Sequence, residues 1–277
     1  MRVMRLRWTS LLAAFAAVCL MAGPRKLRGQ DASPVSPDPV VSPSAPMIAG
    51  VSPATDRDVS WEKLPLNFLH DQENIWLFPV KVAKGRHWVP TIAVVGATAG
   101  LLAADPHDQP YFNHTTAFHG FDQVFSSKVT GVETIAVPAA FYLVGLGRHD
   151  SYMQKTALFA GEAVLDSEMI RMAMNSVTAR WRPSDVAGQK VDNDTFFRNN
   201  IHVGSSFPSG HTIAAFAVAT VIARRYRNHR WVPYVAYGLA GTVGFSRITL
   251  RTHFPSDVFL GAALGYATAR YAVLQGR

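Results

Sequence analysis

The sequence predicts an all-α protein, a helical bundle of about six core helices, and three observations support this prediction. Apolar segments rich in Ala, Leu, Val and Gly recur after residue 88. Polar turns separate these segments from one another. No stretch alternates apolar and polar residues at a period of two for long enough to indicate a sheet. The predicted helices cover about 88–104, 133–147, 156–175, 209–223, 231–246 and 257–273. We therefore expect helices packed on helices.

The composition limits the classes of protein that fit. The 277 residues suffice for one sizeable domain or two small ones. Only 17% of residues are charged and 48% are apolar, so charge is scarce compared with about 25% in typical domains. This scarcity indicates large buried surfaces, in a helical core or in contact with a membrane. The single cysteine, Cys19, excludes disulfide scaffolds, cysteine zinc sites and thiol catalysis in the body of the chain.

The positive charge is concentrated at the N-terminus. The chain has 27 Lys and Arg against 19 Asp and Glu, and six of the basic residues lie within residues 1–30, which contain no acid. The rest of the chain therefore has a net charge of only +2. A nucleic-acid-binding body needs a basic patch, and this balance gives little support for one.

The chain divides into four predicted parts. They are a signal peptide at 1–30, a Pro/Ser-rich linker at 31–58, an amphipathic segment at 59–87 and a helical domain at 88–277. The first part has a basic start and an apolar stretch of twelve residues, which is typical of export signals and short for a membrane span. An uncleaved signal anchor is the alternative. The amphipathic segment fits packing on its own domain, which we favour, or lying on a membrane surface.

Whether the helices span a bilayer is an open question at this stage. An exported N-terminus followed by six spans would put the arginine-rich turn 224–230 outside the cell, against the positive-inside rule. The helix at 156–175 also carries four charged residues, which makes its insertion costly. We therefore expect an exported protein that is periplasmic or associated with the membranes of the cell envelope.

Three polar junctions between the later helices contain the candidate site residues. The first is the run RWRPSD at 180–185, which follows an acidic helix. The second is FPSGHT at 207–212, which opens the next helix. The third joins Ser246 and Arg247 to His253 and Asp257. All three fall at boundaries of predicted elements, where functional side chains are often found.

The junctions have the residue types that bind a phosphoryl-like oxyanion. Ser209 and Gly210 lie where a helix begins, and free N–H groups at helix N-termini favour anions. Arg182 and Arg247 offer forked, permanently charged donors to phosphate oxygens. The sequence therefore predicts an anion site formed by distant segments.

The two histidines add acid–base chemistry. His253 and Asp257 are four residues apart, so a helix started by Pro255 can bring the carboxylate against the imidazole. That carboxylate would support His253 as a nucleophile, while His211 is placed to protonate a leaving oxygen. Each pattern alone is common as capping or structural pairing, and their joint occurrence favours a catalytic site.

Together the motifs resemble the signature of the type 2 phosphatidic acid phosphatase superfamily, which also contains class A acid phosphatases and vanadium haloperoxidases. That signature is Lys, six residues, Arg-Pro; then Pro-Ser-Gly-His; then Ser-Arg, five residues, His, three residues, Asp. The second and third parts are complete at 208–211 and 246–257. The resemblance covers roughly 88–277. It implies a helical fold like that of acid phosphatases and vanadium haloperoxidases, and no metal or other cofactor for a phosphatase.

The resemblance also implies a role for each matched residue. His253 attacks phosphorus to form a phosphohistidine, Asp257 orients it, and His211 is the general acid. The residues that cradle the phosphoryl group are Arg182, Ser209, Gly210 and Arg247.

One position departs from the signature. Where the family has Lys, seven residues before Arg182, this chain has Asn175. A neutral amide can donate a hydrogen bond but cannot neutralise a developing oxyanion. We hypothesise that Arg171, one turn earlier on the same helix face, takes over this role. The alternative is that Arg171 only pairs with Glu168 or another acid.

The polar segment 105–130 is expected to form a loop over the mouth of the site. Its aromatic residues would contact an acyl or prenyl chain there. They are Tyr111, Phe112, Phe118 and Phe121.

The function expected from the resemblance is phosphatase activity on phosphomonoesters or lipid (di)phosphates. The expected partners are a lipid phosphate or a small phosphoester, together with a membrane, and no nucleic acid. Two alternatives remain open. One is a vanadate-dependent haloperoxidase, with vanadate as its cofactor. The other is a non-catalytic phosphate- or phospholipid-binding protein, since Asn175 replaces the lysine of the signature.

Overall fold

A computed structural model describes residues 57–125, 127–187, 195–198 and 205–275. The described residues form helices and no strand, which confirms the all-α prediction. Six long helices correspond to the six predicted segments. They are α5 (Trp88–His114), α7 (Ser127–Gly147), α8 (Ser151–Thr178), α9 (Gly210–Arg225), α10 (Val232–Thr249) and α11 (Pro255–Ala267). The other elements are α3 (Leu64–Trp76), which has the same length as α11, α4 (Phe78–Ala83), α6 (His119–Val124) and a π-helix at Thr268–Val273. The predicted signal peptide and nearly all of the linker lie outside the described residues.

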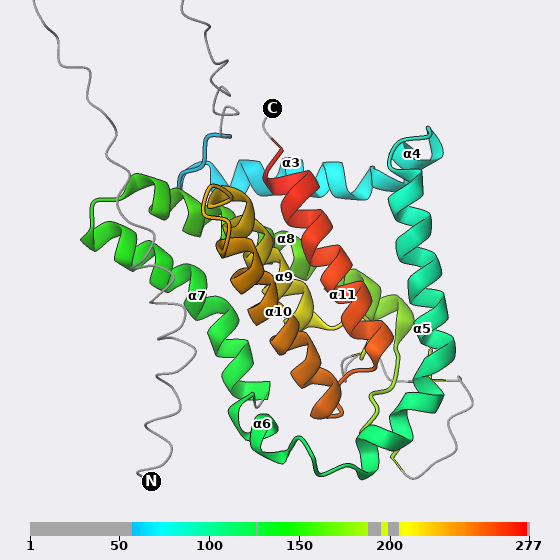
Figure 1. Ribbon diagram of the computed structural model, residues 1–277. Coiled ribbons are helices and arrows are strands. Elements are labelled where there is room, and N and C mark those ends of the chain that lie inside the picture. The colour runs from blue at the N-terminus through cyan, green and yellow to red at the C-terminus, as the bar shows by residue number, and fades with distance from the viewer. Residues whose placement is uncertain (1–56, 126, 188–194, 199–204, 276–277) are drawn as a thin grey trace, which may run out of the picture.

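Helix α9 is the centre of the bundle. It packs against α8, α10 and α11, while α7 covers α8 and α5 lies against α11 (Figure 1). Small and branched side chains such as Ala217 and Val221 are fully buried on α9, and Phe159 and Ala163 of α8 pack in the same core. Because α9 is apolar around most of its circumference, it can be enclosed on several sides. Its N-terminus carries the second motif, so this packing fixes the position of the candidate site.

Helix α11 approaches α9 closely because it has glycines where the two backbones meet. A Cβ atom at Gly265 would lie 2.2 Å from the carbonyl oxygen of Ile213, and one at Gly261 would lie 2.9 Å from that of Ser209. No larger residue fits at Gly265 without moving the helices apart. The two glycines are four residues apart and therefore share one helix face. This contact places the third motif beside the second.

The prediction of a loop at 105–130 is wrong over much of this segment. Helix α5 continues to His114 in spite of internal prolines at 106 and 110, and α6 forms further along. The extension is held by tertiary contacts: Asp105 bonds to the Arg180 side chain, and Gln109 donates to the Pro183 carbonyl oxygen at 3.4 Å. Tertiary contacts therefore override the tendency of proline to end a helix.

Helix α3, within the predicted amphipathic segment, packs on the bundle through its polar face. Asn67, Asp71 and Gln72 are buried, whereas Leu69 is 64% exposed and Trp76 52% exposed. The helix lies across one end of the bundle, against α8 and the π-helix (Figure 1). The segment packs on its own domain, as we favoured, but it does so through its polar face. Its apolar face points outward, where it could lie on a membrane surface.

Among the described residues, α5 is long and apolar enough to cross a membrane, judged by length and composition. Only 11% of its most apolar window is buried inside the protein. Exposed side chains on this helix include Val89, Ile92 and Val95. A core helix of a soluble bundle would bury such residues, so this exposure favours contact with lipid.

Candidate active site

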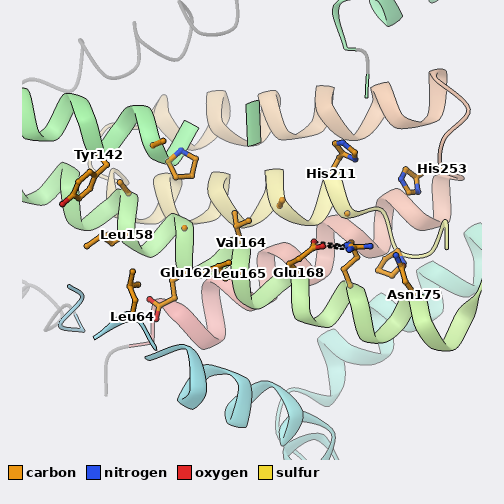
Figure 2. Close-up of a pocket in the computed structure, with 18 of the residues that line it drawn as sticks. Leu64, Tyr142, Leu158, Glu162, Val164, Leu165, Glu168, Asn175, His211 and His253 are labelled. Carbon is orange, nitrogen blue, oxygen red and sulfur yellow. Dashed lines mark hydrogen bonds and ion pairs between the residues drawn. The ribbon is translucent and has the colours of Figure 1, made fainter. Parts of the chain in front are cut away.

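The three motifs meet at one cavity of about 940 Å³. His211, on the first turn of α9, and His253, in the loop before α11, both line it (Figure 2). Arg182 and Gly210 line the same cavity. Residues from three separate stretches of the sequence are therefore brought to one place by the contacts of α9 with α8 and α11. An opening that holds two imidazoles beside guanidinium groups can bind a tetrahedral anion and exchange protons with it.

His253 is held by its Nδ1 atom. This atom lies 2.7 Å from the carbonyl oxygen of Ser206 and 3.7 Å from Oδ2 of Asp257. Since a carbonyl oxygen only accepts hydrogen bonds, Nδ1 carries the proton and donates it. In the neutral ring, Nε2 then keeps its lone pair. This is the tautomer in which Nε2 is able to act as a nucleophile or a base.

Asp257 is fully buried and is held by donors other than His253. Its Oδ2 accepts from the backbone N–H of Phe254 at 2.8 Å and from the Ser206 hydroxyl group. Its Oδ1 accepts from Nη1 of Arg180 at 2.5 Å. The spacing of His253 and Asp257 predicted a direct pair, whereas the structure puts the Ser206 carbonyl oxygen closer to the imidazole.

Two of the four residues predicted to cradle the phosphoryl group do not line the cavity. Ser209 is fully buried as the N-cap of α9, and its hydroxyl group lies 2.9 Å from that of Thr212. Arg247 is also fully buried, and its guanidinium group donates to the Ser246 hydroxyl and to the Phe125 carbonyl oxygen. The backbone oxygen of Arg247 accepts from the N–H of His253 at 3.2 Å. In this conformation Arg247 fixes the loop that carries His253.

The departure at Asn175 is accompanied by a chain of contacts along α8. Nε of Arg171 donates to both oxygens of Glu168 at 2.8 Å, as the dashed lines in Figure 2 mark. In the amide orientation that satisfies its neighbours, Asn175 accepts from Nη1 of Arg171 and donates to the Phe207 carbonyl oxygen, both at 2.6 Å. Arg171 therefore pairs with Glu168 and at the same time lines the cavity.

Gly210 is what allows Arg171 to lie at the cavity. A Cβ atom at this position would be 2.5 Å from Cδ of Arg171. The guanidinium stem thus passes directly over the start of α9, where free backbone N–H groups favour an anion. Arg171 and Arg182 are the two arginines that line the cavity.

Beyond the histidines the cavity becomes apolar. It extends between α7 and α8 toward the start of α3, as Figure 2 shows from His253 and Asn175 at one end to Tyr142 and Leu64 at the other. Leu158, Val164 and Leu165 contribute to its wall, and Glu162 is an acidic exception. An apolar channel next to an anion site can hold a molecule with a charged head and a hydrocarbon tail.

Sequence reasoning missed the side chains behind the site. Arg180 lies in the first motif but was not predicted to act, and Asp105 was placed in a loop. Both are buried and form an ion pair of 2.7 Å. The available signal was the charge of Arg180 beside a tryptophan and two residues before Arg182, which does not reveal its partner.

Comparison with known proteins agrees with the motifs. A family model described as the PAP2 superfamily matches residues 156–277. The matched region contains all three motifs and both histidines. The likeness to the PAP2 superfamily therefore applies to residues 156–277, which make up less than half of the chain. Helices α3 to α7 lie outside the match.

Two curated proteins resemble short stretches of this chain. The lipid A 1-phosphatase of Porphyromonas gingivalis is 44% identical over 62 residues, which cover 22% of this chain and 14% of that protein. The bacitracin transport permease protein BcrC of Bacillus licheniformis is 39% identical over 69 residues, which cover 25% of this chain and 32% of that protein. The chain thus spans less than a third of the length of each relative.

One solved structure also resembles the chain. It is the crystal structure of a transmembrane PAP2-type phosphatidylglycerolphosphate phosphatase from Bacillus subtilis. The likeness covers 72% of this chain and 92% of that one, with 23% identity and a TM-score of 0.37.

Proposed function

We propose that this protein is a phosphatase that hydrolyses lipid phosphates through a phosphohistidine at His253. The observation that carries the proposal is the convergence of His211 and His253 on one cavity that is cationic at one end and apolar along its length. The function also fits the likeness of residues 156–277 to the PAP2 superfamily and the resemblance of a short stretch to a lipid A 1-phosphatase.

In the first step, Nε2 of His253 attacks phosphorus and forms a P–N bond. The bond between phosphorus and the leaving oxygen breaks, and His211 transfers a proton to that oxygen. The hydrogen bond from Nδ1 to the Ser206 carbonyl oxygen holds the ring in the tautomer that this attack requires. Asp257 supplies the negative charge that stabilises the imidazolium character developing on His253.

In the second step, water replaces the histidine. His211, now without its proton, accepts one from the water molecule as its oxygen attacks phosphorus. The P–N bond breaks, inorganic phosphate forms, and the original protonation states return. One pair of histidines therefore serves both steps without a metal or another cofactor.

The phosphoryl oxygens need donors as charge builds up in the transition state. We assign this role to Arg171 and Arg182, together with the backbone N–H groups at Gly210. Asn175 orients Arg171 rather than replacing the lysine of the family signature. The ion pair with Glu168 keeps Arg171 over the start of α9.

The apolar part of the cavity supports a lipid as the substrate. A hydrocarbon chain placed between α7 and α8 would contact Leu158, Val164 and Leu165 while its phosphate lies at the histidines. A small phosphoester would leave this surface in contact with water. The exposed apolar side chains of α5 support action at a membrane, and the N-terminal sequence supports export of the protein.

The direct test is phosphate release by the full chain in detergent micelles, from phosphatidate and from p-nitrophenyl phosphate. We expect release from both, with a higher kcat/KM for phosphatidate, and none from either with His253→Ala. Glu73→Gln, an exposed change on α3, is a matched control and should keep full activity. Phosphatidate binding without turnover would indicate the non-catalytic alternative, and vanadate-dependent halide oxidation would indicate the haloperoxidase.

A further inference from the structure

A buried arginine lies directly behind the candidate nucleophile. Arg180 follows the end of α8 and is only 2% exposed. Two aromatic rings enclose the guanidinium group. Its Cζ atom lies 4.1 Å from the ring centroid of Phe254 and 4.7 Å from that of Phe196. It does not line the cavity, so it has no access to substrate. A group this buried and this close to the site must act through its neighbours.

The donors of Arg180 are divided between two acids. Nη1 donates to Oδ1 of Asp257 at 2.5 Å and to the Ser256 hydroxyl group at 2.8 Å. Nη2 donates to Oδ2 of Asp105 at 2.7 Å, and Nε donates to the Thr195 hydroxyl group at 2.9 Å. One guanidinium group therefore joins α5 to the first turn of α11.

The backbone of Arg180 also supports the loop that holds the imidazole. Its carbonyl oxygen accepts from the N–H of Ser206 at 2.8 Å, and its own N–H donates to the Ser205 hydroxyl group at 2.9 Å. Ser206 in turn contacts both members of the candidate pair, because its carbonyl oxygen accepts from His253 and its hydroxyl group donates to Asp257. Residue 180 thus positions both sides of the imidazole.

Asp105 completes the arrangement from α5. Its Oδ1 accepts from the backbone N–H of Ser256 at 3.2 Å, and its Oδ2 accepts from the Ser256 hydroxyl group as well as from Arg180. It therefore binds the start of α11 directly and competes with Asp257 for the same cation. When two buried carboxylates share one cation, each of them weakens the electrostatic stabilisation that the cation gives to the other.

We propose that Arg180 is a positioning residue for the His253–Asp257 pair, and that Asp105 of α5 sets how much of its positive charge reaches Asp257. The proposal rests on the proposed phosphatase function and adds to it. Arg180 compensates the charge of the buried Asp257 carboxylate, which lies against the imidazole of His253. The titratable groups in contact with Asp257 and Arg180 are His253 and Asp105.

Two substitutions should have opposite effects on the pH profile. In Arg180→Gln the Asp257 carboxylate loses its counter-ion and favours a protonated His253, which cannot attack phosphorus. The acid limb of the pH profile, where kcat/KM falls as the pH is lowered, should therefore move to higher pH. In Asp105→Asn the charge of Arg180 acts on Asp257 undivided, so the acid limb should move to lower pH. For Arg180→Gln we also expect kcat to fall about 10–100-fold with little change in KM, because Arg180 does not touch substrate.

Arg225 offers a matched control. It is also buried, and it donates to the Thr156 hydroxyl group. Its Cζ atom lies 4.2 Å from the ring centroid of Tyr152 and 4.9 Å from that of Phe159. Arg225→Gln should lower the melting temperature without moving the acid limb. Arg180→Lys keeps the charge but not the fork, so we expect it to fold and to shift the limb in the same direction as Arg180→Gln, by a smaller amount.

A second readout does not depend on turnover. The full chain labelled with 15N-histidine reports the protonated fraction of His253 at fixed pH, with the signal assigned by its loss in His253→Gln. We expect a larger protonated fraction in the Arg180 variants and a smaller one in Asp105→Asn. If these shifts in the protonated fraction occur but the chain releases no phosphate from any substrate, the proposed phosphatase function is rejected while the positioning role of Arg180 is supported.

The proposal is overturned if Arg180→Lys and Asp105→Asn leave both the acid limb and the protonated fraction unchanged. It is also overturned if the two variants shift them in the same direction. If Arg180→Gln behaves as Arg225→Gln does, losing stability alone, then Arg180 has only a structural role.

Discussion

Arg171 and Asn175 mark the point where the candidate site departs from the family signature. The lysine of the family signature is replaced by an amide, and the nearest guanidinium group bonds to that amide at 2.6 Å. Arg171 lines the cavity over the glycine that begins α9. A guanidinium group thus lies at the cavity one turn away from the expected lysine, and the proposed function assigns it the role of that lysine.

The first prediction compares these two neighbours. Arg171→Ala should reduce kcat for phosphatidate by about 10²–10³-fold, because it removes a donor that faces developing negative charge. Asn175→Ala should change kcat little, since the ion pair with Glu168 still holds the charge of Arg171 in place. Steady-state kinetics on both variants is the measurement. Small and equal effects would show that Arg171 serves only as the partner of Glu168.

A second group of buried charges lies far from the histidines. Asp166 accepts from the Gln72 side chain at 2.9 Å, and Asp71 and Glu162 add negative charge nearby. Burial, reinforced by those two acids, raises the pKa of Asp166 to about 8. Since the usual pKa of an aspartate is about 3.9, the folded chain binds a proton here that the unfolded chain releases.

The second prediction follows from this proton. Between about pH 4 and pH 8 the folded state binds more protons than the unfolded state. The free energy of unfolding should therefore fall as pH rises, by up to about 1.4 kcal/mol per pH unit. Asp166→Asn should flatten this dependence and be more stable than the wild type at pH 8. Thermal unfolding across that range measures it, with Glu73→Gln on α3 as the control that should keep the wild-type slope.

At the scale of elements, the contact between α9 and α11 holds the two histidines together. Glycine at position 265 lets the α11 backbone approach the carbonyl oxygen of Ile213 on α9. On α9 this contact is only two residues from His211, and it sets the distance between the helix that carries His211 and the loop that carries His253.

The third prediction tests this contact. Gly265→Ala should destabilise the fold by about 1–3 kcal/mol, the usual cost of overpacking, because its Cβ atom would meet backbone that cannot rotate away. Gly241→Ala on α10 is the matched control, since nothing lies within 4 Å of its Cβ position. It should be neutral or slightly stabilising. Equal effects on the melting temperature would show that the close approach has no energetic role.

The elements also show what a sequence can and cannot predict here. Apolar periodicity predicted the six long helices, because each buries or exposes a continuous apolar surface. The helical continuation of α5 past Asp105 was missed, since its support comes from Arg180, 75 residues later in the sequence. The inward polar face of α3 was missed for the same reason. Spacing along the chain gives the motifs, but it does not pair buried charges from distant segments.

The residues of the candidate site were also predicted only in part from the sequence. His211, His253, Gly210 and Arg182 lie together as their motifs suggested. Arg247 was expected beside them and is instead directed to buried partners. A motif identifies which residues gather near a site, whereas the direction of each side chain depends on packing that the motif does not contain.

For the whole molecule, the exposed apolar surface of α5 favours a membrane location. Its apolar residues lie outside the core, and its length suffices for a bilayer. Helix α3 lies across one end of the bundle (Figure 1), and Leu64 at its start lines the end of the cavity opposite the histidines (Figure 2).

The fourth prediction concerns this location. Ile92→Lys puts a charge on a residue of α5 that is 61% exposed. In lipid such a charge costs about 2.5–3.5 kcal/mol near the middle of a span, so the variant should leave the membrane fraction or fail to accumulate. Asn228→Lys, in the exposed turn after α9, should stay in the membrane fraction. If Ile92→Lys fractionates as the wild type does, α5 faces water.

The central claim is that two histidines from distant motifs act on one phosphoryl group. Mass spectrometry of the full chain, quenched at alkaline pH during turnover of phosphatidate, tests it most directly. We expect an acid-labile phosphate on His253, absent in His253→Gln and accumulating in His211→Ala once the first step has occurred, because hydrolysis of the P–N bond then lacks its base. Turnover with no phosphate on His253, or with phosphate on another residue, would contradict the account.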